Sequence, residues 1–350
     1  MYVAILFVIL ALLVILAFFE DERIRNRVWL LVAIGVLLTL YVAFRPAGLD
    51  KDYNSYLGFF KNPTGIVASL AEPTFKIISG FARMCGTPLL IFVIYAFLSV
   101  PLKIYSILRL SPYWYLSILV WFTHLFLIQE MTQIRVAVAT AFFLFSIPYL
   151  AEGRKGKFGL CLIFAILFHY SALALLPLVL IGNKPLSKLF RAVLFVLPVV
   201  MYTTPLVSME LLKMLPIPFV QQKLQMYEEL MIYEGGIWGE INIFNIMALM
   251  RLFAYYMLLL KYDYLSDKYP YMPVFLKIFC YSICLYVGLS FLPPVAMRVE
   301  ELVSIIDCIM FPLLAALIRP HWLGRLSVII YALGILIANI YLYRLLKLNM

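Results

Sequence analysis

The sequence predicts an all-α, polytopic membrane protein, and three observations lead to this prediction. Hydrophobic residues make up 65% of the 350 residues and charged residues only 13%, unlike the composition of soluble domains. Apolar stretches long enough for a helix to cross a bilayer recur along the chain. Lys and Arg gather in short segments between these stretches, as the positive-inside rule describes, so the net charge of +10 is no sign of nucleic-acid binding.

We expect one transmembrane domain, residues 1–350, with about 10–12 membrane helices and outer loops over residues 45–87 and 208–240. The ten stretches expected to cross the bilayer are Tyr2–Phe19, Val28–Phe44, Pro88–Leu108, Tyr113–Ile128, Val136–Ala151, Leu194–Val207, Ile241–Leu260, Tyr271–Leu292, Leu302–Ile318 and Ser327–Tyr343. Glu72–Met84 is too short and too charged to cross, so a helix lying in the interface is expected there.

The apolar segment around His169 is expected to break. Phe158–Phe168 and Ser171–Ile181 could form one span, but basic residues both precede and follow them. The positive-inside rule then places both ends in the cytoplasm. Two short helices that meet near His169 satisfy the rule, and irregular backbone is tolerated at membrane depth where protein or a cavity surrounds it.

The basic loops also predict which face of the membrane carries the chemistry. Three arginines follow the first stretch and place that loop in the cytoplasm. Lys103 and Arg109 likewise mark a second cytoplasmic loop. Most of the acidic residues then fall on the outer face, although they were not used to draw this topology. The outer segments combine these acids with Arg45, Arg135 and Arg298, so we expect any active site there.

The segment Arg45–Tyr56 has an unusual composition for the end of a membrane helix. It holds an arginine, two aspartates, a lysine and two tyrosines directly after an apolar stretch. A membrane helix needs only an aromatic or one cationic anchor at its end. This combination is suited to binding anionic and hydroxyl-rich molecules at the membrane surface.

Four motifs of this chain resemble those of a known family. In order they are Arg45-Pro-x-x-x-Asp-x-Asp-Tyr-x-x-Tyr56, Glu72-Pro-Thr-Phe75, Gln133-Ile-Arg135-x-x-x-Ala139 and Phe168-His169-Tyr-Ser171-Ala172. The ordered set resembles the EpsG family of bacterial exopolysaccharide polymerases, related to the Wzy-type polymerases of O-antigen and capsule. The matching motifs lie in the first half of the chain.

The resemblance implies a GT-C-like, multi-pass glycosyltransferase of the bacterial cytoplasmic (inner) membrane. Such a polymerase transfers a glycan from undecaprenyl pyrophosphate to the sugar of another lipid-linked unit at the outer face. It needs no cofactor and no nucleotide sugar. The expected partners are the lipid-linked oligosaccharide, membrane lipid, and a flippase and chain-length regulator of the same pathway, but no nucleic acid.

The chemistry of this reaction assigns roles to the polar residues. A pyrophosphate leaving group needs cations, and the planar fork of arginine fits phosphate oxygens, so Arg45, Arg135 and Arg298 are candidates. The acceptor hydroxyl needs a general base within hydrogen-bond reach. The candidates for the base are Asp52, Glu72 and His169. The residues expected to help bind the substrate are Asp50, Tyr53, Tyr56 and Gln133, with Tyr227, Tyr233 and Trp238 as further stacking platforms; no metal site is expected.

Each site residue also has a structural interpretation. Arg45 could anchor a helix end at the interface, Arg135 could pair with Glu130, and His169 could bond a backbone carbonyl. Asp52 could be a turn residue that solvates the loop.

Two other classes of membrane protein fit part of the pattern. A transporter or flippase of lipid-linked glycan would also use buried arginines and a broken helix pair. The chain shows no matching halves, however, and its candidate charges gather on one side. An O-antigen ligase or membrane acyltransferase shares many features with the polymerase. An acyltransferase would need an Asn or Asp base partner beside a mid-membrane histidine, and His169 has only Tyr170 and Ser171 next to it in sequence.

Overall fold

The computed structural model describes residues 2–21, 27–64, 71–203 and 241–342, with a few positions between 213 and 229. These residues form fifteen α-helices and five segments of 3-10 or π-helix, which confirms the all-α prediction. Most of the expected outer loop 208–240, including Tyr227, Tyr233 and Trp238, lies outside the described residues.

The chain divides into two compact units. The first comprises Met1–Leu180 together with Ile305–Met350, and the second comprises Ile181–Ser304. Each is described by itself, and the expected single domain stays a prediction.

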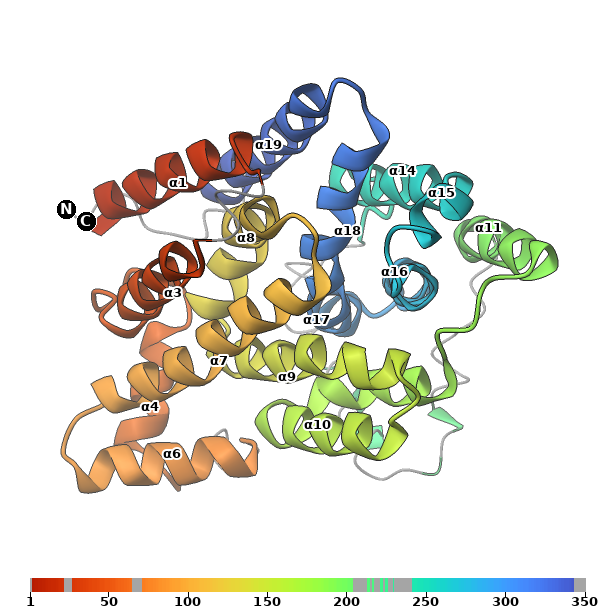
Figure 1. Ribbon diagram of the computed structural model, residues 1–350. Helices are drawn as coiled ribbons and strands as arrows, with labels where there is room; N and C mark the ends of the chain where they lie inside the picture. The colour runs from red at the N-terminus through yellow and green to blue at the C-terminus, as the bar shows by residue number, and fades with distance from the viewer. Residues whose placement is uncertain are drawn as a thin grey trace. The chain divides into compact units, whose positions relative to one another are not determined.

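The first unit contains most of the helices (Figure 1). Its elements are α1 (Tyr2–Phe18), α3 (Val28–Ala43), α4 (Tyr53–Lys61), α6 (Pro73–Met84), α7 (Leu89–Leu110), α8 (Trp114–Trp121), the π-helix η1 (Phe122–Glu130), α9 (Ile134–Ala151), α10 (Lys155–Phe168), the 3-10 helix η2 (Tyr170–Leu180), α18 (Asp307–Leu314), the 3-10 helix η4 (Ala315–Leu317), α19 (His321–Ile337) and the π-helix η5 (Ala338–Leu342). The second unit contains α11 (Lys188–Thr203), α14 (Ile246–Leu260), α15 (Tyr262–Ser266), α16 (Met272–Gly288) and α17 (Pro293–Val303).

Several helices are apolar enough to lie in a membrane. Among the described residues, Leu89–Leu110, Ile134–Ala151 and His321–Leu342 also have the length to cross one. Shorter apolar helices include Tyr2–Phe18 and Val28–Ala43, which have exposed aliphatic side chains suited to lipid. Together these helices indicate a multi-pass membrane protein.

Helix α7 is the central support of the first unit. It packs against α3 on one side and α9 on another, and α9 packs in turn against α10. Its buried face presents Phe92 and Tyr95, which contact residues of α4, α6 and α10. Helix α7 thus supplies two aromatic rings that join α4, α6 and α10.

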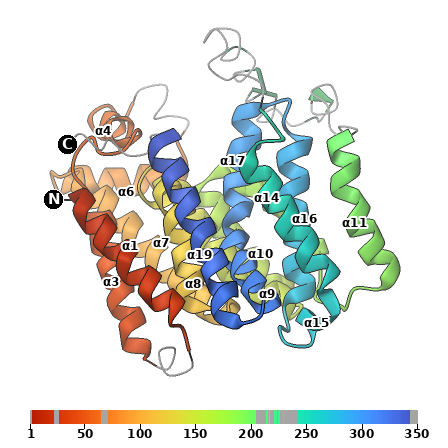
Figure 2. The ribbon, with the colours of Figure 1, turned by 90° about the horizontal axis from the view of Figure 1, so that it is seen from above.

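The two ends of the first unit carry different features. Helices α1 and α19, far apart in sequence, lie side by side (Figures 1 and 2). The short helices α4 and α6 lie at one end of this unit, and the last turn of α1 lies with the start of α19 at the other end (Figure 2).

The predicted break at His169 is present. Helix α10 ends at Phe168, and His169 itself is extended, with φ −155° and ψ 119°. The chain then continues as η2, which packs back against α10. Because His169 interrupts the helix, its side chain is directed by the bend and not by a helical face.

A buried ion pair corrects one prediction from the sequence. Lys103 was expected in a cytoplasmic loop, but it lies inside α7 with its side chain 0% exposed. Its ammonium pairs with Glu130 and donates to Gln129 Oε1 at 2.7 Å, while Ser99 also donates to Glu130. Leaving one member of such a pair alone in the core costs about 3–5 kcal/mol. The loop prediction failed because sequence gave no sign of the partner that neutralises the lysine.

The region around Arg298 also differs from the prediction. Arg298 was expected in an outer segment between the spans Tyr271–Leu292 and Leu302–Ile318. Residues 293–301 instead form most of α17, which begins with prolines at the position where a helix tolerates them. The expected continuous span Leu302–Ile318 is divided among the end of α17, a 3-10 turn, α18 and η4.

Candidate functional site

The loop after α3 folds back so that Asp50 reaches Arg45. Leu49 N–H donates to the Pro46 carbonyl at 3.3 Å, and Gly48 in this turn has φ 77°, a conformation that favours glycine. Arg45 Nε lies 3.1 Å from Asp50 Oδ2, and both side chains are 0% exposed. The sequence pattern Arg-Pro-x-Gly-x-Asp therefore closes a buried ion pair.

Two further contacts fix the guanidinium of Arg45. Its Nη1 donates to the backbone carbonyl of Glu130 at 2.8 Å, and its Cζ lies 4.4 Å from the ring centroid of Phe92. Tyr53 stacks on the same Phe92 ring, with centroids 4.7 Å apart. Arg45 thus joins the loop to η1 and α7.

Asp52, the second aspartate of the loop, directly precedes α4. Asp50 Oδ1 accepts the Asp52 N–H at 3.0 Å, and Asp52 is the half-buried residue before the first turn of α4. One turn later the ring of Tyr56 packs against Phe75. Burial raises the pKa of Tyr56 to about 12, although the nearby Arg135 charge and a hydrogen bond to Arg135 act to lower it.

Glu72 lies at the centre of a second polar group. Pro73 begins α6 and holds the preceding Glu72 in an extended conformation, with ψ 150°. One carboxylate oxygen of Glu72 pairs with Arg135 Nη1, and the other lies 2.9 Å from His169 Nδ1. Three of the four sequence motifs therefore meet through one carboxylate.

The environment keeps Glu72 ionised. Burial acts to raise the pKa of this carboxyl, but the hydrogen bond from His169 and the positive charge of Arg135 outweigh it and lower the pKa to about 2. Glu72 is therefore negatively charged throughout the physiological pH range. A carboxylate with so low a pKa is a weak base, which suits it to hold a neighbour in place.

Of the two arginines Arg45 and Arg135, Arg135 is the more accessible. It lies in the first turn of α9, and its guanidinium lies 5.4 Å from the ring centroid of Phe75 and 5.9 Å from that of Phe59. Its side chain is 24% exposed, whereas that of Arg45 is fully buried. The structural interpretation that pairs Arg135 with Glu130 is wrong, because Arg135 pairs with Glu72 and Glu130 pairs with Lys103.

The other predicted site residues occupy separate positions. Gln133 directly precedes α9, and its Oε1 is buried with no hydrogen-bond partner among the described residues. Arg298 is an exposed residue of α17 in the second unit. The structure thus brings together Arg45 with Asp50, and Glu72 with Arg135 and His169.

Sequence reasoning missed several residues that support the site. Thr74 donates from its hydroxyl to the Leu167 carbonyl at 2.6 Å and so ties the start of α6 to the end of α10 beside His169. Phe92 and Tyr95 form the aromatic wall from α7. Thr74 lies within a motif and could have been found, but the two α7 residues resemble any other apolar residues of a membrane helix.

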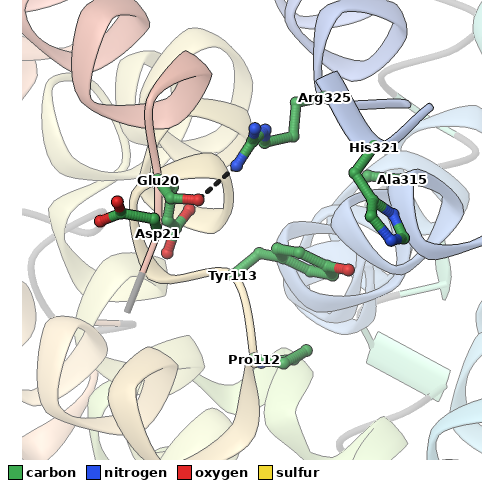
Figure 3. A pocket seen from close by; sticks show the side chains of 7 residues that line it. All are labelled: Glu20, Asp21, Pro112, Tyr113, Ala315, His321 and Arg325. Carbon is green, nitrogen blue, oxygen red and sulfur yellow. Dashed lines mark hydrogen bonds between the residues drawn. The ribbon is translucent and has the colours of Figure 1, made fainter. Parts of the chain in front are cut away.

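A cavity of the first unit lies away from these residues (Figure 3). It has a volume of about 370 Å³ and is lined by Glu20, Asp21, Pro112, Tyr113, Ala315, His321 and Arg325. The Glu20 carboxylate accepts the N–H groups of Tyr115 and Leu116 at 3.3 and 3.2 Å, and Arg325 donates to the Glu20 carbonyl. These contacts cap α8 and join three helices. No candidate site residue lines the cavity, which lies at the end of the unit away from α4 and α6 (Figure 2).

Comparison with known proteins places the chain in a family. Residues 28–349 match the EpsG family, and this range includes all four motifs. No curated protein and no solved structure matches the chain. The chain therefore belongs to the EpsG family, and this membership implies a role in exopolysaccharide biosynthesis.

Proposed function

We propose that the protein is a glycosyltransferase that polymerises lipid-linked oligosaccharide repeat units at the outer face of the cytoplasmic membrane. The observation that carries the proposal is the chain of contacts from Arg135 through Glu72 to His169. It joins a cation suited to pyrophosphate with a histidine suited to proton transfer. Membership of the EpsG family supports the substrate class.

His169 is the general base in this proposal. Its Nδ1 faces the Glu72 carboxylate at 2.9 Å, so Nε2 is the ring nitrogen that would accept a proton. A carboxylate in this position holds the imidazole in one tautomer and stabilises the imidazolium when it forms. Glu72 therefore acts as the orienting carboxylate. The unperturbed pKa of histidine, near 6.5, suits general-base work better than that of an aspartate.

The reaction is a substitution at the anomeric carbon of the donor glycan. The acceptor hydroxyl oxygen forms the new bond to this carbon while His169 Nε2 takes its proton. The bond from the carbon to the pyrophosphate oxygen breaks, and undecaprenyl pyrophosphate leaves with the electron pair. Negative charge then builds on the pyrophosphate, where a positioned guanidinium stabilises it.

Arg135 is placed to contact this leaving group, because it combines a permanent charge with side-chain exposure. Arg45 is sealed by Asp50 and Phe92, so in this proposal it fixes the loop that carries Asp52 and Tyr53. Tyr53 is half-buried at the start of α4, where its ring could contact a sugar face. Asp52, on the same loop, would bind sugar hydroxyls and is the second candidate for the base.

A purified-protein assay tests the proposal. The protein in detergent or vesicles receives a synthetic repeat unit on undecaprenyl pyrophosphate, with no nucleotide sugar present. A ladder of longer glycans and release of undecaprenyl pyrophosphate are expected. If the lipid-linked unit crosses the vesicle membrane but its length never changes, the polymerase proposal fails and the transporter alternative takes its place.

The location of the site on the outer face has its own test. In a variant without native cysteines, Ser55→Cys on α4 is expected to react with a membrane-impermeant thiol reagent in intact cells, once any outer-envelope barrier is opened. Lys155→Cys, at the start of α10, is expected to react only after the cytoplasmic membrane is broken. Labelling of position 155 in intact cells would reverse the topology and contradict the outer-face assignment.

A further inference from the structure

The Glu72 carboxylate serves two groups with different tasks. One oxygen neutralises Arg135, and the other binds His169. The cation proposed for the leaving group and the base proposed for the acceptor therefore share a single negative charge.

We propose that Glu72 is an exchangeable counter-ion, which the donor's pyrophosphate displaces from Arg135 while Glu72 keeps its bond to His169. The inference rests on the proposed function and adds the order of events to it. Donor binding then precedes activation of the base.

The exposure of the three side chains explains why the donor would displace Glu72 from Arg135 and not from His169. The Arg135 side chain is 24% exposed, whereas that of Glu72 is 4% exposed and that of His169 is 13% exposed. An incoming anion therefore reaches the guanidinium without first displacing His169. Pyrophosphate carries more charge than one carboxylate and offers two oxygens to the arginine fork, so it competes well for Arg135.

The neighbours of the pair keep Arg135 in place during the exchange. The rings of Phe59 and Phe75 lie against its guanidinium, and the Tyr56 hydroxyl of α4 interacts with it. Tyr95 of α7 also faces this group and interacts electrostatically with Arg135 and Glu72. Arg135 can thus change its anionic partner without moving far.

The exchange couples the two halves of the reaction. Once pyrophosphate neutralises Arg135, the Glu72 charge acts on His169 alone, which makes the imidazole a stronger proton acceptor. The base is then strengthened only when a leaving group is present. Before the donor arrives, Arg135 weakens this effect.

The Arg45–Asp50 pair of the same unit is buried and is therefore closed to an incoming anion. Both side chains are 0% exposed, and the guanidinium also bonds the Glu130 carbonyl and lies over Phe92. Among the described residues, the Arg45 guanidinium is therefore covered on every side. We therefore assign the exchange to Arg135 and not to Arg45.

Binding of inorganic pyrophosphate to the purified protein tests the exchange by calorimetry. Glu72→Gln is expected to bind pyrophosphate about 10-fold more tightly than the wild type, because the competing charge is gone, a change within the usual range for coupled sites. Glu72→Asp has a shorter reach to Arg135, so it is expected to tighten pyrophosphate binding by a smaller factor. It replaces Glu72→Gln in the test if that variant does not fold. Arg135→Gln is expected to abolish the binding.

Glu152→Gln is the matched control. Glu152 follows the last residue of α9, whereas Arg135 lies in its first turn, so the variant removes the same charge far from the site. Its pyrophosphate affinity should equal that of the wild type. The exchange is overturned if Glu72→Gln binds pyrophosphate no more tightly than the wild type. It is also overturned if Glu152→Gln tightens pyrophosphate binding as much as Glu72→Gln does.

These outcomes separate the inference from the proposed function. Tighter pyrophosphate binding by Glu72→Gln with no glycan ladder from the wild type supports the exchange and rejects the polymerase. A ladder from the wild type with unchanged affinity in Glu72→Gln supports the polymerase and rejects the exchange.

Discussion

His169→Gln is expected to lower polymerisation by about 10²- to 10⁴-fold, the range that a positioned general base contributes. The amide can still hydrogen-bond Glu72 and fill the space, but it cannot accept the proton of the acceptor hydroxyl. Binding of the lipid-linked donor should persist, since Arg135 and the aromatic wall remain. The measurement is the initial rate of glycan-ladder formation at saturating donor, with protein amounts matched.

His321→Gln is the control for this variant. His321 is an exposed residue at the start of α19, at the other end of the unit, and its replacement should leave the rate unchanged. Asp52→Asn decides the remaining choice of base. If Asp52→Asn abolishes turnover while His169→Gln retains it, the base is Asp52, and the Glu72–His169 contact is structural.

The helices themselves were largely predictable, because membrane helices are defined by local composition. Val28–Phe44 was expected and α3 covers Val28–Ala43, and the span expected at Val136–Ala151 begins two residues earlier as α9. The break at His169 was also predictable, since basic residues on both sides favour a broken or re-entrant pair over a single span. Each of these features depends on residues that are neighbours in sequence.

The ion pairs were not predictable for the opposite reason. Glu72 directly precedes α6 and Arg135 lies in α9, and neither motif indicates that its charged residue pairs with the other. Lys103 looked like a topology anchor because its only visible property was its charge. Its partner Glu130 approaches through the packing of α7 against η1, which depends on how each helix is rotated about its axis. Hydropathy does not determine this rotation for helices that are apolar on every side.

The same limit explains the region around Arg298. A run of two prolines followed by charged residues is typical of a loop, yet prolines also begin helices, and here they begin α17. The local pattern permits both outcomes, and packing of α17 against α16 selects the helix. Arg298 was a candidate because of its charge and its expected position at the outer end of a span. Arg135, in the first unit, is partly exposed and is linked to His169 through Glu72.

Arg135→Lys is expected to remove most of the activity although the charge is kept. A lysine ammonium is a compact point charge that cannot bridge two phosphate oxygens as a guanidinium fork does. It also loses the cation–π contact of the guanidinium with the rings of Phe75 and Phe59. The effect should fall on turnover more than on donor affinity, because charge builds on the pyrophosphate as the bond breaks.

Arg154→Lys provides the comparison at an exposed site, since Arg154 precedes α10 on the predicted cytoplasmic side and pairs with Glu152. A topology anchor needs only its charge, so this variant should polymerise at the wild-type rate. The ratio of turnover rates at matched expression gives the result. If Arg135→Lys and Arg154→Lys are equally active, Arg135 acts only as a partner that holds Glu72 in place, and the leaving group must find its cation elsewhere.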